Sequence, residues 1–202
     1  MMSSIQFNLR LLKARFKAFR EDESGVASIE AILLLPLLFW AYLGTFVIFD
    51  AFKKQTDGLR VTYAVADAIS REDAALNQTY LNNMRTLTNF LTRTPERVTQ
   101  RVTIVCYSES EERYAAAWSR VSGPKQADYP AHTEWTLEAN KHRLPNLPLG
   151  DQLILVETFM DYQPVWNVGI DDKTFEYWVF TRPRFASQVK WENQNSWVCP
   201  AT

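Results

Sequence analysis

The feature that most constrains this chain is an uninterrupted stretch of 19 residues without a charge, residues 31–49. A helix of about 20 apolar residues is long enough to cross the hydrocarbon core of a bilayer. Glu30 lies at the edge of the stretch, where a charge costs less than the roughly 2.5–3.5 kcal/mol found at mid-span. The stretch therefore predicts a membrane-spanning helix with one carboxylate whose presence needs a reason.

Composition indicates a folded domain beside this helix. The chain has 202 residues, a formal net charge of −1, and 7 tryptophans, 8 tyrosines and 12 phenylalanines. More than half of these aromatic residues follow residue 100, and disordered tails are poor in such residues. Because there is no basic excess, nucleic acid is not an expected partner.

Basic residues precede the apolar stretch at Arg10, Lys13, Arg15, Lys17 and Arg20. The positive-inside rule therefore predicts a cytoplasmic N-terminus, with residues 50–202 outside the cytoplasm, although Lys53 and Lys54 make the bias partial. A cleaved secretory signal is the competing interpretation. No small-x-small cleavage site follows the stretch, which favours a retained anchor.

The two cysteines, Cys106 and Cys199, both fall in the part expected to be exported. Two cysteines in an oxidising compartment favour one disulfide, and two buried free thiols are the alternative. Neither belongs to a CxxC pair, so neither a metal site nor a redox centre is expected, and no cofactor is implied.

The helix is expected to continue past the membrane to about Ser70, with Gly58 as an interruption. A second helix is expected from a cap at Ser70. Its apolar face carries Leu76, Tyr80, Met84, Leu87 and Leu91, at helical spacing. We expect this face to pack on the domain's own sheet, and binding of a partner helix is the alternative.

Strands are predicted at residues 102–107, 153–162 and 174–182, with a short one at 135–138. Residues 114–121 are expected to be a helical or looped excursion, and residues 144–150 a loop. The predicted fold class is α+β: a long N-terminal transmembrane helix that extends out of the membrane, a second helix, then a small antiparallel sheet. The predicted divisions are a cytoplasmic leader (1–25), the transmembrane helix (26–49), extramembrane helices (50–94) and a periplasmic α+β domain (95–202).

A small residue, Gly25, stands just before the apolar helix, and Glu30 is the fifth residue after it. This is the pattern of prepilin-type leader peptides, in which cleavage between Gly25 and Val26 leaves the membrane helix in place. When such helices bundle, the Glu30 carboxylate enters a region of low dielectric and needs a positive partner. The free α-amino group of Val26 on a neighbouring subunit is such a partner, and the pair would set the axial register.

Residues 19–31, followed by Leu-Leu-Pro-Leu-Leu at 34–38, resemble the N-terminal signature of TadE/TadG-like pilus-assembly proteins, and residues 177–185 resemble the end of TadE-like members more weakly. One departure is Ala31, where the family commonly has phenylalanine. The chain is too short for the large von Willebrand-type domain of TadG-like members, so it is more similar to the TadE-like group.

The resemblance implies a minor pilin or pseudopilin of a tight-adherence, Flp-type pilus. It implies a bacterial inner-membrane location with the domain in the periplasm, and incorporation into the pilus is compatible with it. The implied partners are a prepilin peptidase and other pilins or pilus-assembly proteins. Gly25 would carry processing, and Glu30 recognition or assembly.

Two other classes of function compete with this one. The only histidines are His132 and His142, and GxSxG, HExxH and glycine-rich phosphate loops are absent, so an enzyme is not expected. The remaining alternative is an unprocessed single-pass periplasmic binding or scaffold protein. Its recognition surface would use the late tryptophans, which more often fill a core; they are Trp166, Trp178, Trp191 and Trp197.

Overall fold

The computed structural model describes residues 15–18, 20, 25–94, 96–108, 113–148 and 150–194. The chain divides into two compact units, Met1–Val47 (unit 1) and Ile48–Thr202 (unit 2). The long helix α2 (Val26–Ser70) begins in unit 1 and ends in unit 2. Its 45 residues confirm the predicted continuation to Ser70, but the interruption predicted at Gly58 is wrong, because the helix continues through that residue.

Unit 1 is described mainly by the first part of α2. Leucine, alanine and isoleucine dominate this part, and the helix runs through Pro36 without ending. Val47, at the end of this part, is buried. Most of the other large apolar side chains are exposed: Val26, Ile29, Ile32, Leu33, Leu34, Leu35, Leu37, Leu38, Phe39, Trp40, Tyr42 and Phe46. A helix that is apolar all round needs an apolar environment to cover it.

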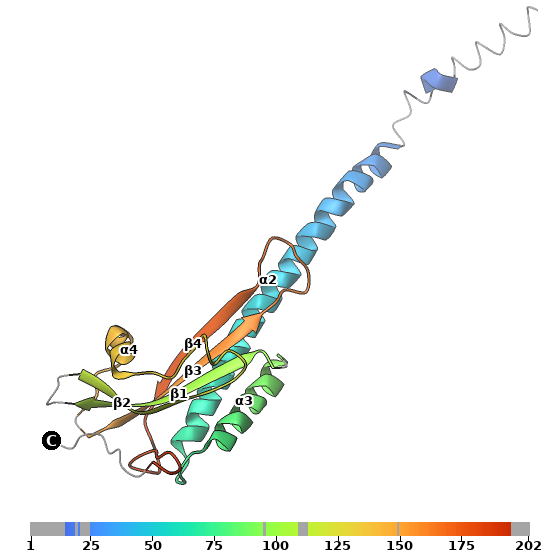
Figure 1. Cartoon of the computed structure of the whole chain (residues 1–202). Helices are drawn as coiled ribbons and strands as arrows, with labels where there is room; N and C mark the ends of the chain where they lie inside the picture. Colours follow the sequence, from blue (N-terminus) through green and yellow to red (C-terminus); the bar gives the residue numbers. More distant parts are fainter. Residues whose placement is uncertain are drawn as a thin grey trace, which may run out of the picture. The chain divides into compact units, whose positions relative to one another are not determined.

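Unit 2 is a four-stranded antiparallel sheet with helices, which confirms the α+β class (Figure 1). The strand order is β2-β1-β3-β4, and Ile104 of β1 pairs with both Trp118 of β2 and Ile154 of β3. After α2, the elements in chain order are α3 (Gln78–Thr92), β1 (Val98–Ser108), β2 (Arg113–Ser122), α4 (Glu134–Ala139), the 3-10 helix η2 (Lys141–Arg143), β3 (Gln152–Tyr162) and β4 (Lys173–Thr181).

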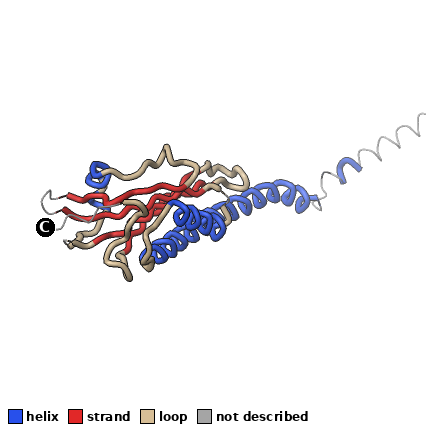
Figure 2. Tube along the Cα trace, turned by 60° about the horizontal axis from the view of Figure 1, so that its bottom comes forward, coloured by secondary structure: helices blue, strands red, loops and turns tan. Residues whose placement is uncertain are grey.

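One face of the sheet is covered by the second part of α2 and by α3 (Figures 1 and 2). Val65 and Ile69 of α2 belong to the same buried cluster as Ile104 and Ile154 of the central strands, and Leu81 of α3 completes it. Burying a Val, Leu or Ile side chain stabilises a fold by about 1.5–3 kcal/mol. The main core of unit 2 therefore lies between this face and the two helices.

The opposite face is covered by the long connection between β2 and β3, residues 123–151, which includes α4. Leu137 of α4 and Leu144 after η2 pack with Val105, Leu153 and Leu155 of the sheet. The central strands β1 and β3 are therefore buried on both faces, which explains why they read as continuous apolar runs rather than as alternating patterns.

The segment after β4 returns to the sheet and closes the core. The Leu76 N–H donates to the Lys190 carbonyl at 2.8 Å, and the Glu192 N–H donates to the Leu76 carbonyl at 2.8 Å. Trp118 Nε1 donates to the Val189 carbonyl at 3.0 Å. These three hydrogen bonds place residues 189–192 beside β2 and the segment just before α3.

Strands β1, β3 and β4 confirm the predictions at residues 102–107, 153–162 and 174–182, and residues 144–148 form the predicted loop. The predicted start of the second helix was wrong. Helix α3 begins at Gln78, and its N-cap Asn77 accepts the Tyr80 N–H through Oδ1 at 2.9 Å. Ser70 instead ends α2, where its hydroxyl donates to the Asp67 carbonyl at 2.7 Å. Asparagine is among the strongest N-caps, which explains why the helix begins after position 77 rather than after Ser70.

Two further predictions were wrong in type. Residues 114–121 belong to β2, because pairing with β1 and burial outweigh the weak strand preference of their three consecutive alanines. Residues 135–138 belong to α4, a helix rather than a strand. Thr133 caps it and exchanges hydrogen bonds with Thr136 in a capping box.

Candidate processing site, membrane segment and buried charge cluster

The Gly25–Val26 junction lies at the start of a helix. Val26 is the first residue of α2, and Gly25 immediately precedes it. Gly25 is exposed, and no described atom lies within 4 Å of a Cβ built there, while Val26 is 56% exposed. No described part of the chain covers this peptide bond, so an enzyme could reach it.

Glu30 is the fifth residue of α2 and is exposed. It lies four positions after Val26, so the two are on the same face of the helix, about 6 Å apart along the axis. The N-terminus of a helix carries a partial positive charge, which favours nearby carboxylates. The arrangement places a carboxylate one turn from the helix start, at the edge of the charge-free stretch.

The helix that follows is long and apolar enough to cross a membrane. It is the one such helix in the described part of the chain, and only 6% of its most apolar 18-residue stretch is buried within the protein. A core helix of a soluble protein with the same composition would be covered by its own domain. The structure confirms one helix with the length and composition that a membrane span requires. That it spans a membrane, and in which orientation, stays a prediction.

Unit 2 contains a buried charge cluster that the sequence did not reveal. Glu157 of β3 is fully buried and forms a two-pronged pair with Arg101 of β1, at 2.5 Å to Nη2 and 2.6 Å to Nε. His132 Nε2 lies 2.8 Å from the same carboxylate. The only signal for this cluster is one acidic residue inside the apolar run of β3, because His132 has no sequence pattern that links it to either strand.

Burial raises the pKa of Glu157, but the hydrogen bonds and charges of His132 and Arg101 outweigh burial and leave the pKa below its ordinary value. The cluster extends along the sheet. The backbone N–H of His132 donates to Ser119 Oγ at 2.9 Å, and Arg101 Nη1 donates to the Pro130 carbonyl at 2.7 Å. The cluster therefore ties the β2–β3 connection to the sheet. The Glu157 side chain is 0% exposed and the His132 side chain is 4% exposed, so a substrate cannot reach them. The buried charge cluster therefore has a structural role.

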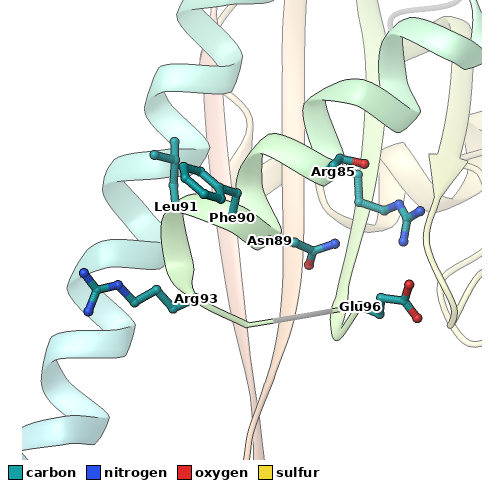
Figure 3. Close-up of a pocket in the computed structure, with 7 residues that line it drawn as sticks. Arg85, Asn89, Phe90, Leu91, Arg93 and Glu96 are labelled. Carbon is teal, nitrogen blue, oxygen red and sulfur yellow. The ribbon is translucent and has the colours of Figure 1, made fainter.

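An open groove of about 840 Å³ lies at the C-terminal end of α3. Figure 3 shows Arg93 pointing away from Arg85 and Glu96, with Phe90 and Leu91 projecting from the last turns of the helix. Because Arg93 points away from the other two charged side chains, the three do not form a cage for a small ligand. Across the described part of the chain, no group of three or more His, Cys, Asp or Glu side chains could hold a metal ion.

The apolar face predicted on the second helix divides into two parts. Tyr80 and Met84 pack against the main core, and Leu76 ahead of the helix is buried in it, so this part covers the domain's own sheet as expected. Leu87 and Leu91 are 41% and 46% exposed. The face therefore leaves the core in the last turns of α3.

The predicted disulfide stays a prediction. Cys106 is fully buried in β1, and Cys199 lies outside the described residues. Of the late tryptophans, Trp178 and Trp191 pack against core clusters, Trp166 is 45% exposed, and Trp197 also lies outside the described residues. Most of the described ones therefore contribute to packing rather than to a recognition surface.

No family model matches the sequence, and no curated protein matches it. The functional assignment therefore rests on the residues of this chain.

Proposed function

We propose that this chain is a membrane-anchored minor pilin or pseudopilin that takes part in assembly of a Tad, Flp-type pilus, and that it is processed between Gly25 and Val26. The observation that carries the proposal is the coincidence of three features at one place: an open glycine junction, the first residue of α2, and Glu30 at the fifth helical position. Cleavage there would release the leader and leave the spanning helix complete.

The position of the junction gives Glu30 a physical role. After cleavage, the α-amino group of Val26 would stand at a helix N-terminus, where the helix dipole adds to its positive charge. A carboxylate from a neighbouring helix would stabilise that charge, and it would be stabilised in turn as both leave water. Pairing of Glu30 with Val26 of the next subunit would thus set the axial register of a helix bundle.

The exposed apolar part of α2 supports the same assignment. Most of its side chains are exposed, so neighbouring helices could pack on it once it leaves the lipid. The basic residues before the helix favour a cytoplasmic N-terminus, which would place unit 2 in the periplasm. The partners of this assembly would be other pilins, and the processing enzyme a prepilin peptidase.

N-terminal sequencing of the membrane-extracted protein tests the proposal in a host that has the peptidase. We expect the wild type to begin at Val26 and Gly25→Ala to keep its leader. Gly44→Ala is the matched control, because Gly44 is also a glycine with open space around it but lies within the spanning helix. Full-length wild-type protein in that host would overturn processing and favour an unprocessed single-pass scaffold.

A further inference from the structure

The loop between β3 and β4, residues 163–172, carries exposed apolar side chains. Val165 is 64% exposed and Trp166 is 45% exposed. The loop is closed at its base, where Gln163 Nε2 donates to Asp172 Oδ2 at 3.1 Å. Its outer part therefore presents Val165 and Trp166 from a loop whose two ends are joined.

This loop adjoins the first turns of α2 within unit 2. Ile48, Ala51 and Phe52 of α2 line a groove of about 250 Å³ together with Ile170 of the loop and Phe175 of β4. Two phenylalanines of the same helical turns point outward, since Phe49 is 69% exposed and Phe52 is 65% exposed. The loop that carries Val165 and Trp166 therefore lies beside the turns of α2 that carry Phe49 and Phe52.

The position along α2 relates this region to the membrane surface. The charge-free stretch ends at Phe49, and Asp50 is the first charge beyond it. A helix rises about 1.5 Å per residue, and the headgroup layer adds roughly 5–8 Å beyond the hydrocarbon on each side. Residues 50–54 of a helix that spans through residue 49 therefore lie at the level of the lipid headgroups. The groove beside the loop is lined by α2 residues at this same level.

We propose that Val165 and Trp166, with Phe49 and Phe52, form a lipid-docking surface that rests in the interfacial layer of the bilayer spanned by α2. Tryptophan and other aromatic residues favour this layer, because it accommodates an apolar ring and a polar edge together. The docking surface would hold unit 2 against the bilayer before assembly. The inference rests on the membrane anchorage in the proposed function and is independent of cleavage at Gly25.

The charges around the docking surface are mixed. The acidic side chains are Asp50, Asp171 and Asp172, and the basic ones are Lys53, Lys54 and Lys173. Attraction to anionic headgroups needs a surplus of Lys and Arg, which this region lacks. Insertion of apolar side chains therefore drives the contact, and we expect it to be the same in neutral and anionic lipids and at low and high salt.

Fluorescence quenching by lipids tests the inference on the full chain reconstituted in phosphatidylcholine vesicles. Bimane is attached to Val165→Cys, to Leu38→Cys in the spanning helix, and to Trp135→Cys on α4, which is 81% exposed. The unsubstituted chain, labelled in parallel, gives the background from the two native cysteines. With nitroxide lipids, we expect loss of fluorescence at positions 38 and 165 and no loss at position 135.

A second comparison uses the label at position 165 in two further backgrounds. Phe52→Ser removes part of the docking surface and is expected to reduce the quenching. Phe185→Ser changes a phenylalanine that is 69% exposed outside this surface and is expected to leave the quenching unchanged.

Three results would overturn the inference. Quenching at position 38 without quenching at position 165 would leave the anchorage intact and show that the loop does not dock. Absence of quenching at position 38 would remove the membrane anchorage, and with it both proposals. The label at 165 could also be unquenched by nitroxide lipids and yet become protected from aqueous iodide as the protein-to-lipid ratio rises. That result would assign the surface to a second copy of the chain.

Discussion

Gly58 of α2 lies against the ring of Tyr177 in β4: a Cβ at position 58 would be 2.5 Å from both the ring Cζ and the hydroxyl oxygen. The Tyr177 hydroxyl donates to the Lys54 carbonyl at 3.5 Å, one turn earlier on the helix. Burial, and next the Asp57 carboxylate, raise the pKa of Tyr177 well above its ordinary value. Gly58 is therefore not an interruption of the helix but a place where the helix approaches the sheet closely.

Gly58→Ala should destabilise unit 2 even though alanine is the better helix former. Overpacking costs about 1–3 kcal/mol, which exceeds the gain of up to about 1 kcal/mol in helix propensity. For a chain of this size each kcal/mol lowers the melting temperature by about 2–4 °C. Thermal unfolding of the full chain in detergent measures the change.

Gly44→Ala, in open space on the same helix, serves as the control and should not lower the melting temperature. In a Tyr177→Leu background, Gly58→Ala should cost less, because the atoms that the new methyl would meet are gone. An equal cost in both backgrounds would contradict the close-approach explanation.

Glu157→Gln should cost about 3–5 kcal/mol of unfolding free energy, because it leaves the buried Arg101 guanidinium without a counter-charge. The Arg101 side chain is only 11% exposed, so water cannot replace the carboxylate. Urea unfolding of the wild type and the variant measures the difference.

Glu176→Gln is the matched control. Glu176 pairs with Arg143 at 3.3 Å, but its side chain is 47% exposed, so its loss should change stability by no more than about 0.5 kcal/mol. Similar losses in the two variants would show that the buried cluster is not a special source of stability.

The same carboxylate predicts a dependence of stability on pH. The pKa of Glu157 in the folded chain lies below the ordinary value of 4.5, so the unfolded chain binds more protons in the acidic range. The contribution of Glu157 is therefore complete above pH 4.5 and is lost as the pH falls through the folded pKa. Unfolding free energies measured from neutral pH downward should converge for the wild type and Glu157→Gln, and a constant gap would contradict the prediction.

Glu30→Gln should leave membrane insertion normal and abolish pilus assembly, because it removes the negative charge proposed to pair with the Val26 α-amino group. Membrane fractionation and electron microscopy of surface pili measure the two outcomes separately. Asp73→Asn, which removes an exposed carboxylate beyond the end of α2, should leave both unchanged. Normal piliation of Glu30→Gln would remove the register role.

Intact mass before and after reduction decides the state of Cys106 and Cys199. A disulfide predicts a gain of two hydrogens on reduction and no alkylation beforehand, and Cys106→Ser should then cost about 2–4 kcal/mol of stability. Alkylation of both cysteines in the unreduced, denatured chain would show free thiols instead.

Local sequence patterns predicted those helices and strands that are determined by residues close together in the chain. The apolar run before Phe49 predicted α2, since its exposed side chains need no partner in the domain to be helical. The β-branched and aliphatic runs of β1 and β3 predicted central strands. The glycine before α2 and the carboxylate at Glu30 were visible for the same reason, because a processing pattern is linear in sequence.

What the sequence by itself determined is thus the long helix, the two buried strands, the α+β class and the candidate processing junction. Only the tertiary structure decided that the alanines of β2 form a strand, since their state depends on pairing with β1 rather than on their own preference. It also decided the Glu157–Arg101–His132 cluster and the contact of Gly58 with Tyr177. The residues in these contacts are separated by between 25 and 119 positions in the sequence. No local sequence pattern indicates that such distant residues meet.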